Sequence, residues 1–594
     1  MKTYVRISFV VSICLFVGLF LFIARAVLAE NPDGGWQTLA PGIEYQEFRQ
    51  FDSDAYVARM EITNTNVTID SIIAGGTLSG GTEQVSGMFN RYEDTINNWH
   101  PQQKWGNRND VVVAINGYFY GPPVEPPGVP WRGQIHSGWY AKRHDNNENG
   151  SGFVWKLDRT AFVGECVFHQ PAEQLVTFAG TTTTTLKITD INAPREDDQL
   201  ILYTPQFDAD TQTNDDGVEV LVEMTRPTLI LPPSLSTGLD LGPFQDWLEF
   251  PPPIFHDPSA EALGYVRQIL DGQGSMTIPF DHVVLSATGL PREKLLENLQ
   301  VDMEIGISQA VAHLSNDDCV TPVTGKDWTK AYASVGGSFY FLEDGLIDTF
   351  PGDPQANAHD PRTAIAYNED HVFFIVVDGR NPGVSEGMNM GELGYFARET
   401  LGADFGIAQD GGGSSTMVVN GEVVNVPSDE IIPVPCNLDP FSLGGSGTPS
   451  FLPIVINAQA TPGVTPTPSA SPTASPSPTP SLTPTPTGTP GICYQGTERF
   501  VANGMMMVVV APMMTSTLFT PGQSVETTIE ANLRLGPGTN YPVLATLPAG
   551  STGTVKAHSN NLDGVLATGL YWWKVNFGGG QVGWISESVL TGGP

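Results

Sequence analysis

The chain has 594 residues, several times the ~150 typical of one domain, so we expect two or three folding units. Acidic residues outnumber basic residues by 64 to 28. The resulting formal net charge of −36 argues against sequence-independent binding to nucleic acid or to an anionic membrane surface. Only 15% of residues are charged and 40% are hydrophobic, which excludes a disordered acidic chain.

Residues 1–29 have the layout of a secretory signal peptide. Lys2 and Arg6 precede an apolar run at residues 7–23, and the small residues up to Ala29 suit cleavage. An uncleaved anchor is the alternative, because the run approaches the length of a membrane-spanning helix. With either, we expect a secreted, extracellular protein that could stay near the cell envelope.

One of the five cysteines lies in this apolar run, and the others are Cys166, Cys319, Cys436 and Cys493. An oxidising compartment permits disulfide bonds between them, and buried thiols are the alternative. They form no CxxC or Cys/His cluster with the spacing of a zinc site. We therefore expect no metal and no cofactor.

Residues 30–460 form a long block that mixes short β-branched runs with a few helical stretches. The expected strands lie at residues 111–115, 200–203, 218–222 and 372–377. The best helical pattern spans residues 390–401 and is stopped by Gly402. This pattern predicts an α+β domain with a central mixed β-sheet and flanking helices.

Asn116-Gly117 directly follows the first of these expected strands. An Asn-Gly pair at this place commonly forms a turn. The functional alternative is an amide held at the end of a sheet, where it would orient a substrate hydroxyl or a phosphate oxygen.

Arg362-Thr363 enters another β-branched run. The planar guanidinium fork of an arginine matches two phosphate oxygens, whereas a surface salt bridge is the plain alternative. In a chain with only 28 basic residues, we favour the interpretation as a site residue.

Two acids follow apolar runs farther along the chain. Asp378 comes after the strongest expected strand, with Arg380 and the helix that carries Glu392 beyond it. Asp410 is followed by Gly411-Gly412-Gly413-Ser414. An Asp-Gly pair alone indicates a turn, but glycines after an acid also let backbone N–H groups approach an anion closely. Together these segments favour an anion-handling active site.

Such a site allows two chemistries. One is glycoside cleavage assisted by a carboxylate, and the other is hydrolysis at phosphorus, which usually recruits metal ions. The histidines show no HxH or HExxH spacing, so the metal-dependent reaction is the weaker interpretation.

Taken together, these segments resemble the phosphodiester glycosidase family over about residues 100–435, with the Asp-Gly-Gly-Gly-Ser segment at 410–414 as the most specific part. Members cleave the bond between a sugar's anomeric carbon and a phosphodiester oxygen. The resemblance therefore implies a glycosidase acting on a sugar-1-phosphodiester, such as an N-acetylglucosamine-1-phosphodiester. Departures from the family pattern are Gln409, Ala366 and the segment 430–436.

The resemblance also implies roles for individual residues. The expected catalytic residues are Asp378, Glu392, Asp410 and Arg362. The expected substrate-binding residues are Asn116, Gly117, Thr363, Arg380, Gly411, Gly412, Gly413 and Ser414. Arg362 and the glycine segment would hold phosphate, Asn116 would orient the sugar, and which acid serves as base or nucleophile is open.

Residues 461–491 consist almost entirely of Pro, Thr, Ser, Ala and Gly, which predicts an extended linker. A C-terminal module is expected at residues 492–594, with a small all-β barrel at about 525–590 because short strands alternate with Gly and Pro turns. The barrel resembles a bacterial SH3-type domain at Asn532, Arg534, Gly538, Trp573 and Gly583-Trp584. That resemblance implies binding of cell-wall peptide or glycan, and a structural spacer is the alternative.

A secreted glycosidase held near the cell wall by the barrel is the leading functional hypothesis. A non-catalytic protein that binds envelope glycan or sugar phosphate is the first alternative, and a metal-dependent phosphodiesterase is the second. We expect no nucleic-acid partner and no membrane contact beyond the N-terminal segment.

Overall fold

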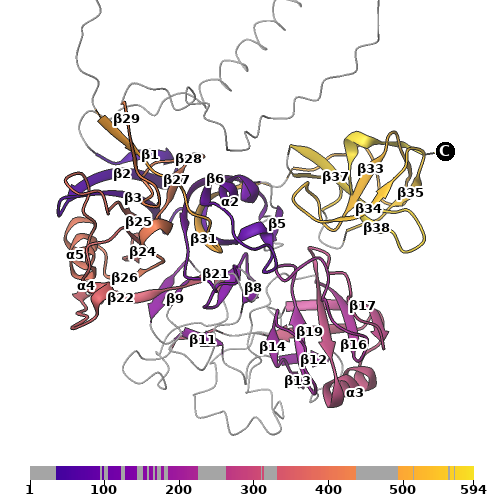
Figure 1. The fold of residues 1–594 in the computed structure, drawn as a ribbon. Helices are drawn as coiled ribbons and strands as arrows, with labels where there is room; N and C mark the ends of the chain where they lie inside the picture. The colour runs from indigo at the N-terminus through magenta and orange to yellow at the C-terminus, as the bar shows by residue number, and fades with distance from the viewer. Residues whose placement is uncertain are drawn as a thin grey trace, which may run out of the picture.

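The computed structural model describes most of the chain from residue 35 onward (Figure 1). The described residues are 35–93, 96–99, 105–121, 128–142, 152–156, 159–164, 167–169, 175–178, 185–224, 262–308, 311–313, 331–435, 492–512, 514–558, 562–567 and 569–593. The N-terminal segment, the linker at 461–491 and the side chains of all five cysteines lie outside this description. The predictions of a signal peptide and of disulfide bonds therefore stay predictions.

The first sheet is fully antiparallel and has eight strands. In spatial order they are β1 (Gln37–Ala40), β2 (Ile43–Gln50), β3 (Ser53–Glu61), β25 (His371–Val377), β24 (Arg362–Tyr367), β26 (Phe405–Ala408), β22 (Ser338–Glu343) and β23 (Leu346–Ile347). Every residue of β24 is buried, as are the last six of β25. This double-sided burial explains why residues 364–367 of β24 and 372–377 of β25 do not alternate between apolar and polar side chains.

The second sheet packs beside the first and shares a core with it. Its strands are β28 (Glu422–Val423), β27 (Met417–Val419), β6 (Trp105–Asn116), β31 (Asn503–Pro512) and β4 (Val67–Ile73), with β5 (Ile96–Trp99) paired to β6. Figure 1 shows β31, from late in the chain, beside β6 from its early part.

A third sheet completes this part of the molecule. Its strands are β10 (Ala161–Gly164), β9 (Gly152–Lys156), β21 (Ala331–Gly336), β7 (Gln134–His136) and β8 (Trp139–Lys142). A separate two-stranded sheet pairs β11 (Val167–His169) with β20 (Val311–His313).

Another eight-stranded sheet packs around a second core, to which Ile135, Val154 and Phe162 of the third sheet also contribute. Its strands are β13 (Thr185–Lys187), β12 (Leu175–Phe178), β19 (Glu304–Ser308), β17 (Ala262–Asp271), β16 (Val218–Met224), β18 (His282–Ala287), β15 (Leu200–Tyr203) and β14 (Asp190–Ile191). We call it the inserted unit, because it lies in sequence between strands of the other sheets.

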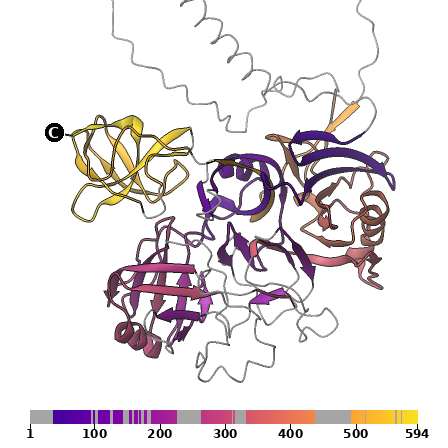
Figure 2. The same ribbon diagram turned by 180° about the vertical axis from the view of Figure 1, so that it is seen from behind.

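The C-terminal module is all-β, with strands that curl around a small core. They are β34 (Val543–Leu547), β33 (Ala531–Arg534), β38 (Val582–Ser586), β37 (Leu570–Asn576), β35 (Thr552–Val555), β32 (Ser524–Thr527) and β39 (Leu590–Gly592), with β36 (Val565–Ala567) paired to β37. In both Figure 1 and Figure 2 this yellow barrel lies beside the magenta inserted unit.

The predicted α+β fold is wrong, because the described part of the chain is mostly antiparallel β-structure. Its α-helices are only α2 (Val85–Glu93), α3 (Gly289–Asn298), α4 (Pro354–Asn357) and α5 (Met390–Tyr395), and a π-helical turn at Phe396–Thr400 extends α5. The sheets cover one another, so flanking helices are not needed to bury their apolar faces. No helix of the described residues is long and apolar enough to cross a membrane.

The expected start of the C-terminal module at residue 492 also differs from the structure. β31 is a central strand of the second sheet, and Met505, Met506 and Met507 are fully buried there. Just before it, β30 (Ile492–Gln495) pairs with β29 (Ile432–Pro435). Residues 492–512 therefore belong to the large block, and the barrel begins after them.

Candidate functional site

Three neighbouring strands bring Asp378 and Asp410 to one end of the first sheet. Arg362 at the start of β24 pairs with Val377 at the end of β25, and the end of β26 pairs with the same part of β24. Asp378 and Asp410 therefore follow the two strands that flank β24. Because neighbouring strands are ~4.8 Å apart, the backbones of these two acids lie roughly 10 Å apart.

Asp410 is 7% exposed and is held by the loop that follows it. Its backbone N–H donates to the carbonyl of Gly117 over 3.0 Å, and Ser414 Oγ donates to its Oδ2 over 2.6 Å. Burial raises the pKa of Asp410 to about 6, although the Ser414 hydrogen bond and the charges of Arg499 and Arg380 oppose this shift. The carboxyl can therefore gain or lose a proton close to neutral pH.

Two arginines lie against the glycines that follow Asp410. A Cβ atom added to Gly412 would lie 2.9 Å from Nη2 of Arg380, and one added to Gly413 would collide with Arg499. Gly412 also has a φ of +62°, which L-residues with side chains rarely adopt. Gly412 and Gly413 thus leave room beside the backbone for the side chains of Arg380, Arg499 and Asp429.

Each of these arginines already pairs with an acid. Nε of Arg380 lies 2.9 Å from Oδ1 of Asp360, and Nε of Arg499 lies 2.7 Å from Oδ2 of Asp429. The two arginine side chains remain 47% and 40% exposed, respectively. Since a guanidinium carries five N–H donors, both can still donate toward solvent or a bound anion.

Asn116 and Thr363 lie in this region but bond to the protein itself. Asn116 Nδ2 donates to the carbonyl of Asp410 over 2.7 Å, and its Oδ1 accepts from Thr363 Oγ1 over 2.7 Å and from the N–H of Thr416 over 3.2 Å. These contacts tie β6 and β24 to the glycine loop. Asn116 therefore acts as a positioning residue here, and its amide is not turned to a ligand.

Arg362 is also engaged by the protein. Its Nε donates to the carbonyl of Met388 over 2.8 Å, and its Nη2 donates to the carbonyls of Gln355 and Ala358 over 2.8 and 2.7 Å. Burial lowers the pKa of the guanidinium. These donors hold the loops around the sheet edge, whereas the exposed cations of the site are Arg380 and Arg499.

Asp378 is 4% exposed and lines a cavity of about 240 Å³. Asn425 Nδ2 and the N–H of Val426 donate to the carboxylate, each over 2.9 Å at its shortest, and Tyr56 also bonds to it. Burial nevertheless raises the pKa of Asp378 to about 6. The other residues lining the cavity are Asp54, Gly379, Asn381, Val384, Ser385, Val426, Ile431 and Tyr494.

Glu392 lies in the first turn of α5. Asn389 Oδ1 accepts from the N–H of Glu392 over 3.0 Å, and Glu392 Oε2 accepts from the N–H of Asn389 over 3.1 Å, which is a capping box. Its Oε2 also lies 2.9 Å from Nε2 of His359. Among the described contacts, none joins Glu392 to Asp378 or Asp410.

Sequence reasoning missed Arg499 and Tyr120 as members of this site. Tyr120 donates its hydroxyl to the carbonyl of Phe500 over 3.0 Å, and burial followed by the charge of Asp410 raises its pKa. Arg499 follows the long linker in sequence and was expected in the C-terminal module. The sequence does show an arginine, a scarce residue in this chain, just before an apolar run. Only the pairing of β31 in the second sheet, however, places Arg499 near Asp410.

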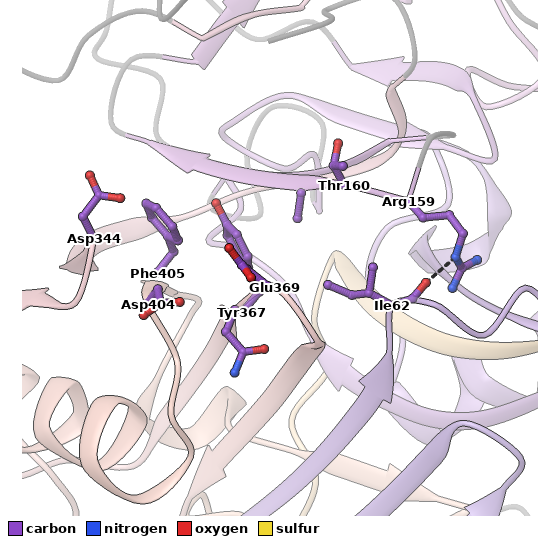
Figure 3. Close-up of a pocket in the computed structure, with 10 residues that line it drawn as sticks. Ile62, Arg159, Thr160, Asp344, Tyr367, Glu369, Asp404 and Phe405 are labelled. Atoms are coloured by element: carbon purple, nitrogen blue, oxygen red, sulfur yellow. Dashed lines mark hydrogen bonds between the residues drawn. The ribbon is translucent and has the colours of Figure 1, made fainter. Parts of the chain in front are cut away.

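A larger cavity, of about 420 Å³, lies at the opposite end of β24 and β26 (Figure 3). Tyr367 and Phe405 stack there with ring centroids 4.9 Å apart, and Asp344, Glu369 and Asp404 line the cavity with them. No residue predicted to form the site lines this cavity. We therefore take the Asp410 end of the sheet as the candidate site.

Comparisons with known protein families match two parts of the chain. Residues 287–438 match the family model of phosphodiester glycosidases, and residues 529–591 match that of the bacterial SH3 domain. The two matches confirm both resemblances seen in the sequence, each for the part of the chain that it covers. Arg362, Asp378, Glu392 and Asp410 lie within the matched glycosidase segment, whereas Asn116 and Arg499 lie outside it.

Three solved structures show weak similarity. A hypothetical protein from Synechocystis is 14% identical with a TM-score of 0.40, and the match covers 67% of this chain and 61% of that one. A putative exported protein from Burkholderia pseudomallei is 15% identical with a TM-score of 0.38, covering 64% and 71%. The zebrafish N-acetylglucosamine-1-phosphodiester α-N-acetylglucosaminidase catalytic domain, auto-inhibited by its pro-peptide, is 12% identical with a TM-score of 0.29, covering 66% and 78%.

This chain spans less than two thirds of the Synechocystis protein, and TM-scores this low carry no argument about fold or activity. No curated protein matches the chain.

Proposed function

We propose that the chain is a glycosidase that hydrolyses the bond between the anomeric carbon of a sugar and the phosphate of a sugar-1-phosphodiester. The observation that carries the proposal is a buried carboxyl, Asp410, with a pKa of about 6, placed against a glycine loop between two half-exposed arginines. A site of this composition can hold an anionic group next to a carboxyl that changes charge near neutral pH.

In this proposal Arg380 and Arg499 donate hydrogen bonds to the phosphate oxygens. Their remaining N–H groups suit this because charge-assisted bonds from guanidinium to phosphate are short and strong. They also stabilise the phosphomonoester that departs when the bond to the anomeric carbon breaks. Such a leaving group keeps the bonding electron pair without needing a strong acid.

Asp410 then acts at the anomeric carbon as an ionised carboxylate. It either takes a proton from the attacking water or attacks the carbon directly, and in both cases a carboxylate is needed opposite the developing oxocarbenium ion. Asp378, whose pKa is also about 6, is the second candidate carboxyl. Ser414 and Asn116 act through Asp410, by holding its carboxylate and its loop.

The test uses the full chain and a sugar-1-phosphate ester of an aromatic alcohol. We expect release of free reducing sugar that is unchanged by a chelator and is lost in Asp410→Asn. Release of sugar-1-phosphate with sensitivity to the chelator would point to a phosphodiesterase, and binding without turnover to a non-catalytic protein. Full turnover by both Asp410→Asn and Asp378→Asn would overturn the assignment.

Export and retention at the cell wall through the barrel belong to the same proposal. The bacterial SH3 match supports a peptide- or glycan-binding module. Pull-down of the full chain with insoluble cell-wall material, compared with pull-down of a chain that ends at residue 512, tests the retention. Equal recovery of both would remove this part of the proposal.

A further inference from the structure

Phe280, a residue of the inserted unit just before β18, inserts its ring into an aromatic cluster of the barrel. Its ring centroid lies 5.6 Å from that of Tyr541, 6.2 Å from that of His558 and 5.6 Å from that of Trp584. Its backbone N–H donates to the carbonyl of Leu535 over 3.3 Å. The barrel thus contacts both the ring and the backbone of this one residue.

The next residue, Asp281, places its carboxylate among basic groups. His558 Nε2 lies 2.7 Å from Oδ2, and Nζ of Lys574 lies 3.5 Å from the same oxygen. His282, of the inserted unit, contacts Oδ1 over 2.6 Å. Asp281 is only 5% exposed, so these basic groups replace the water that a carboxylate would otherwise need.

A metal ion is a poorer explanation of this cluster. Potential ligand atoms of Glu223, Asp281 and His558 do lie within 4.8 Å of one another. The ammonium group of Lys574, however, lies within 3.7 Å of Glu223 and 3.5 Å of Asp281, so a cation already occupies the space between the acids. The arrangement is therefore one that recognises a carboxylate.

We propose that the barrel carries a binding site for a peptide with an aromatic residue followed by an acidic one, and that Phe280-Asp281 fills this site from within the same chain. We call the site the barrel pocket, formed by Leu535, Tyr541, His558, Lys574 and Trp584. Its parts match one dipeptide: a carbonyl for the backbone N–H, three rings for the aromatic side chain, and two basic groups for the carboxylate.

One polar group of the aromatic cluster around Phe280 has no partner in the part of the chain that the structure describes. Trp584 is 1% exposed, and its Nε1 has no hydrogen-bond partner among the described residues. A buried indole N–H without an acceptor is costly, and tryptophans usually find one. Phe280-Asp281 supplies no acceptor for this donor.

Competition decides when an outside peptide can bind. Phe280-Asp281 belongs to the same chain as the barrel, so it competes at an effective concentration that a dilute outside peptide does not reach. An outside peptide therefore binds the wild-type chain weakly and binds well only when the internal pair is withdrawn or removed. The barrel of the resting molecule is a closed binding module.

The experiment measures binding of acetyl-Gly-Gly-(4-fluoro-Phe)-Asp-Gly-Gly-amide to full-length chains by the width of its ¹⁹F line. We expect the apparent Kd of Phe280→Ala/Asp281→Asn to be at least about tenfold lower than that of the wild type. Adding Lys574→Met should remove this gain, and a peptide with Asn in place of Asp should bind more weakly. Equal binding to wild type and double variant, or no effect of Lys574→Met, overturns the proposal.

A single substitution keeps the test valid if the double variant fails to fold. Asp281→Asn preserves the size of the side chain and the Phe280 ring, and we expect about threefold tighter peptide binding than in the wild type. Asp302→Asn is the matched control, because this acid of the same unit is exposed and pairs only with Arg267 among the described ion pairs. Equal peptide binding by Asp281→Asn and Asp302→Asn would contradict the internal competition.

Discussion

Asp410 and Asp281 are both almost fully buried, yet their pKa values move in opposite directions. Burial opposes ionisation of both carboxyls. At Asp410 it prevails and raises the pKa to about 6. At Asp281, Lys574, His282 and His558 outweigh burial and hold the pKa well below its usual value.

The two pKa values differ because the neighbouring cations pair with different acids. Arg380 and Arg499 pair with Asp360 and Asp429 and influence Asp410 only from beyond those contacts. The basic groups around Asp281 contact its oxygens directly. A buried carboxyl thus stays available for proton transfer where the neighbouring cations pair with other acids. It stays ionised where the cations contact its own oxygens.

The largest expected effect comes from removing the titratable carboxyl. Asp410→Asn should lower kcat/KM for a sugar-1-phosphodiester by at least about 100-fold, because a positioned base typically contributes about 100- to 10,000-fold. Steady-state kinetics on purified full-length chains measure this. Asp404→Asn, at the opposite end of β26, is the matched control and should stay within about twofold of the wild type.

Removing the fixed charge should act on stability instead. Asp281→Ala removes the acid that contacts the buried His558 and His282 and leaves the partly buried Lys574 with Glu223 alone, so we expect a loss of about 3 kcal/mol in the unfolding free energy at pH 7. Urea unfolding followed by tryptophan fluorescence measures it, with the exposed Asp302→Ala as control. An unchanged transition for Asp281→Ala would show that the cluster stabilises nothing.

Arg499→Gln should raise KM by about tenfold with a smaller change in kcat, since one charge-assisted bond to the phosphate is lost. Arg398, also partly exposed and paired with the neighbouring Glu399, provides a control of the same residue type. Arg398→Gln is expected to keep KM unchanged. A similar KM for both variants would remove Arg499 from the site.

The smallest effect concerns pH. Because Asp410 must be ionised, kcat/KM should rise with pH through about 6. The charge of Arg499 lowers the pKa of Asp410, so Arg499→Gln should move this rise to higher pH. A pH profile measured at several ionic strengths checks both expectations, and a profile that is flat between pH 5 and pH 7 would contradict them.

The same contrast appears in stability. The raised pKa of Asp410 means that ionisation costs stability as pH rises from 3.8 to about 6. The depressed pKa of Asp281 adds stability that is complete above 3.8 and is lost as pH falls further. The two aspartates therefore act on stability in separate pH ranges.

Parts of the site could be predicted because they are local in sequence. Asp378 and Asp410 each follow a buried apolar run, and three consecutive glycines mark the loop after Asp410. The strands at 111–115, 200–203, 218–222 and 372–377 were confirmed for the same reason. A continuous run of apolar, β-branched residues is recognised from adjacent positions and needs no distant partner.

Contacts between distant segments could not be predicted. β31 is a Met- and Val-rich run whose sequence fits a strand of the barrel equally well. Only its pairing with β6 and β4 brings Arg499 close to Asp410. Asp281 and His558 are 277 positions apart, and no spacing rule links them. The α+β prediction was wrong for a similar reason. A strand pattern does not show whether a sheet is covered by helices or by another sheet.

The pairing of β29 with β30 has a practical consequence. It places Pro435 opposite Ile492, so the two residues that bound the segment 436–491 lie side by side. A single cut between these residues would yield two polypeptides, one with Asp410 and the other with Arg499. Because β31 is enclosed between β4 and β6, we expect the pieces to remain joined. Expressed separately, the two halves would form a split enzyme whose activity reports their reassembly.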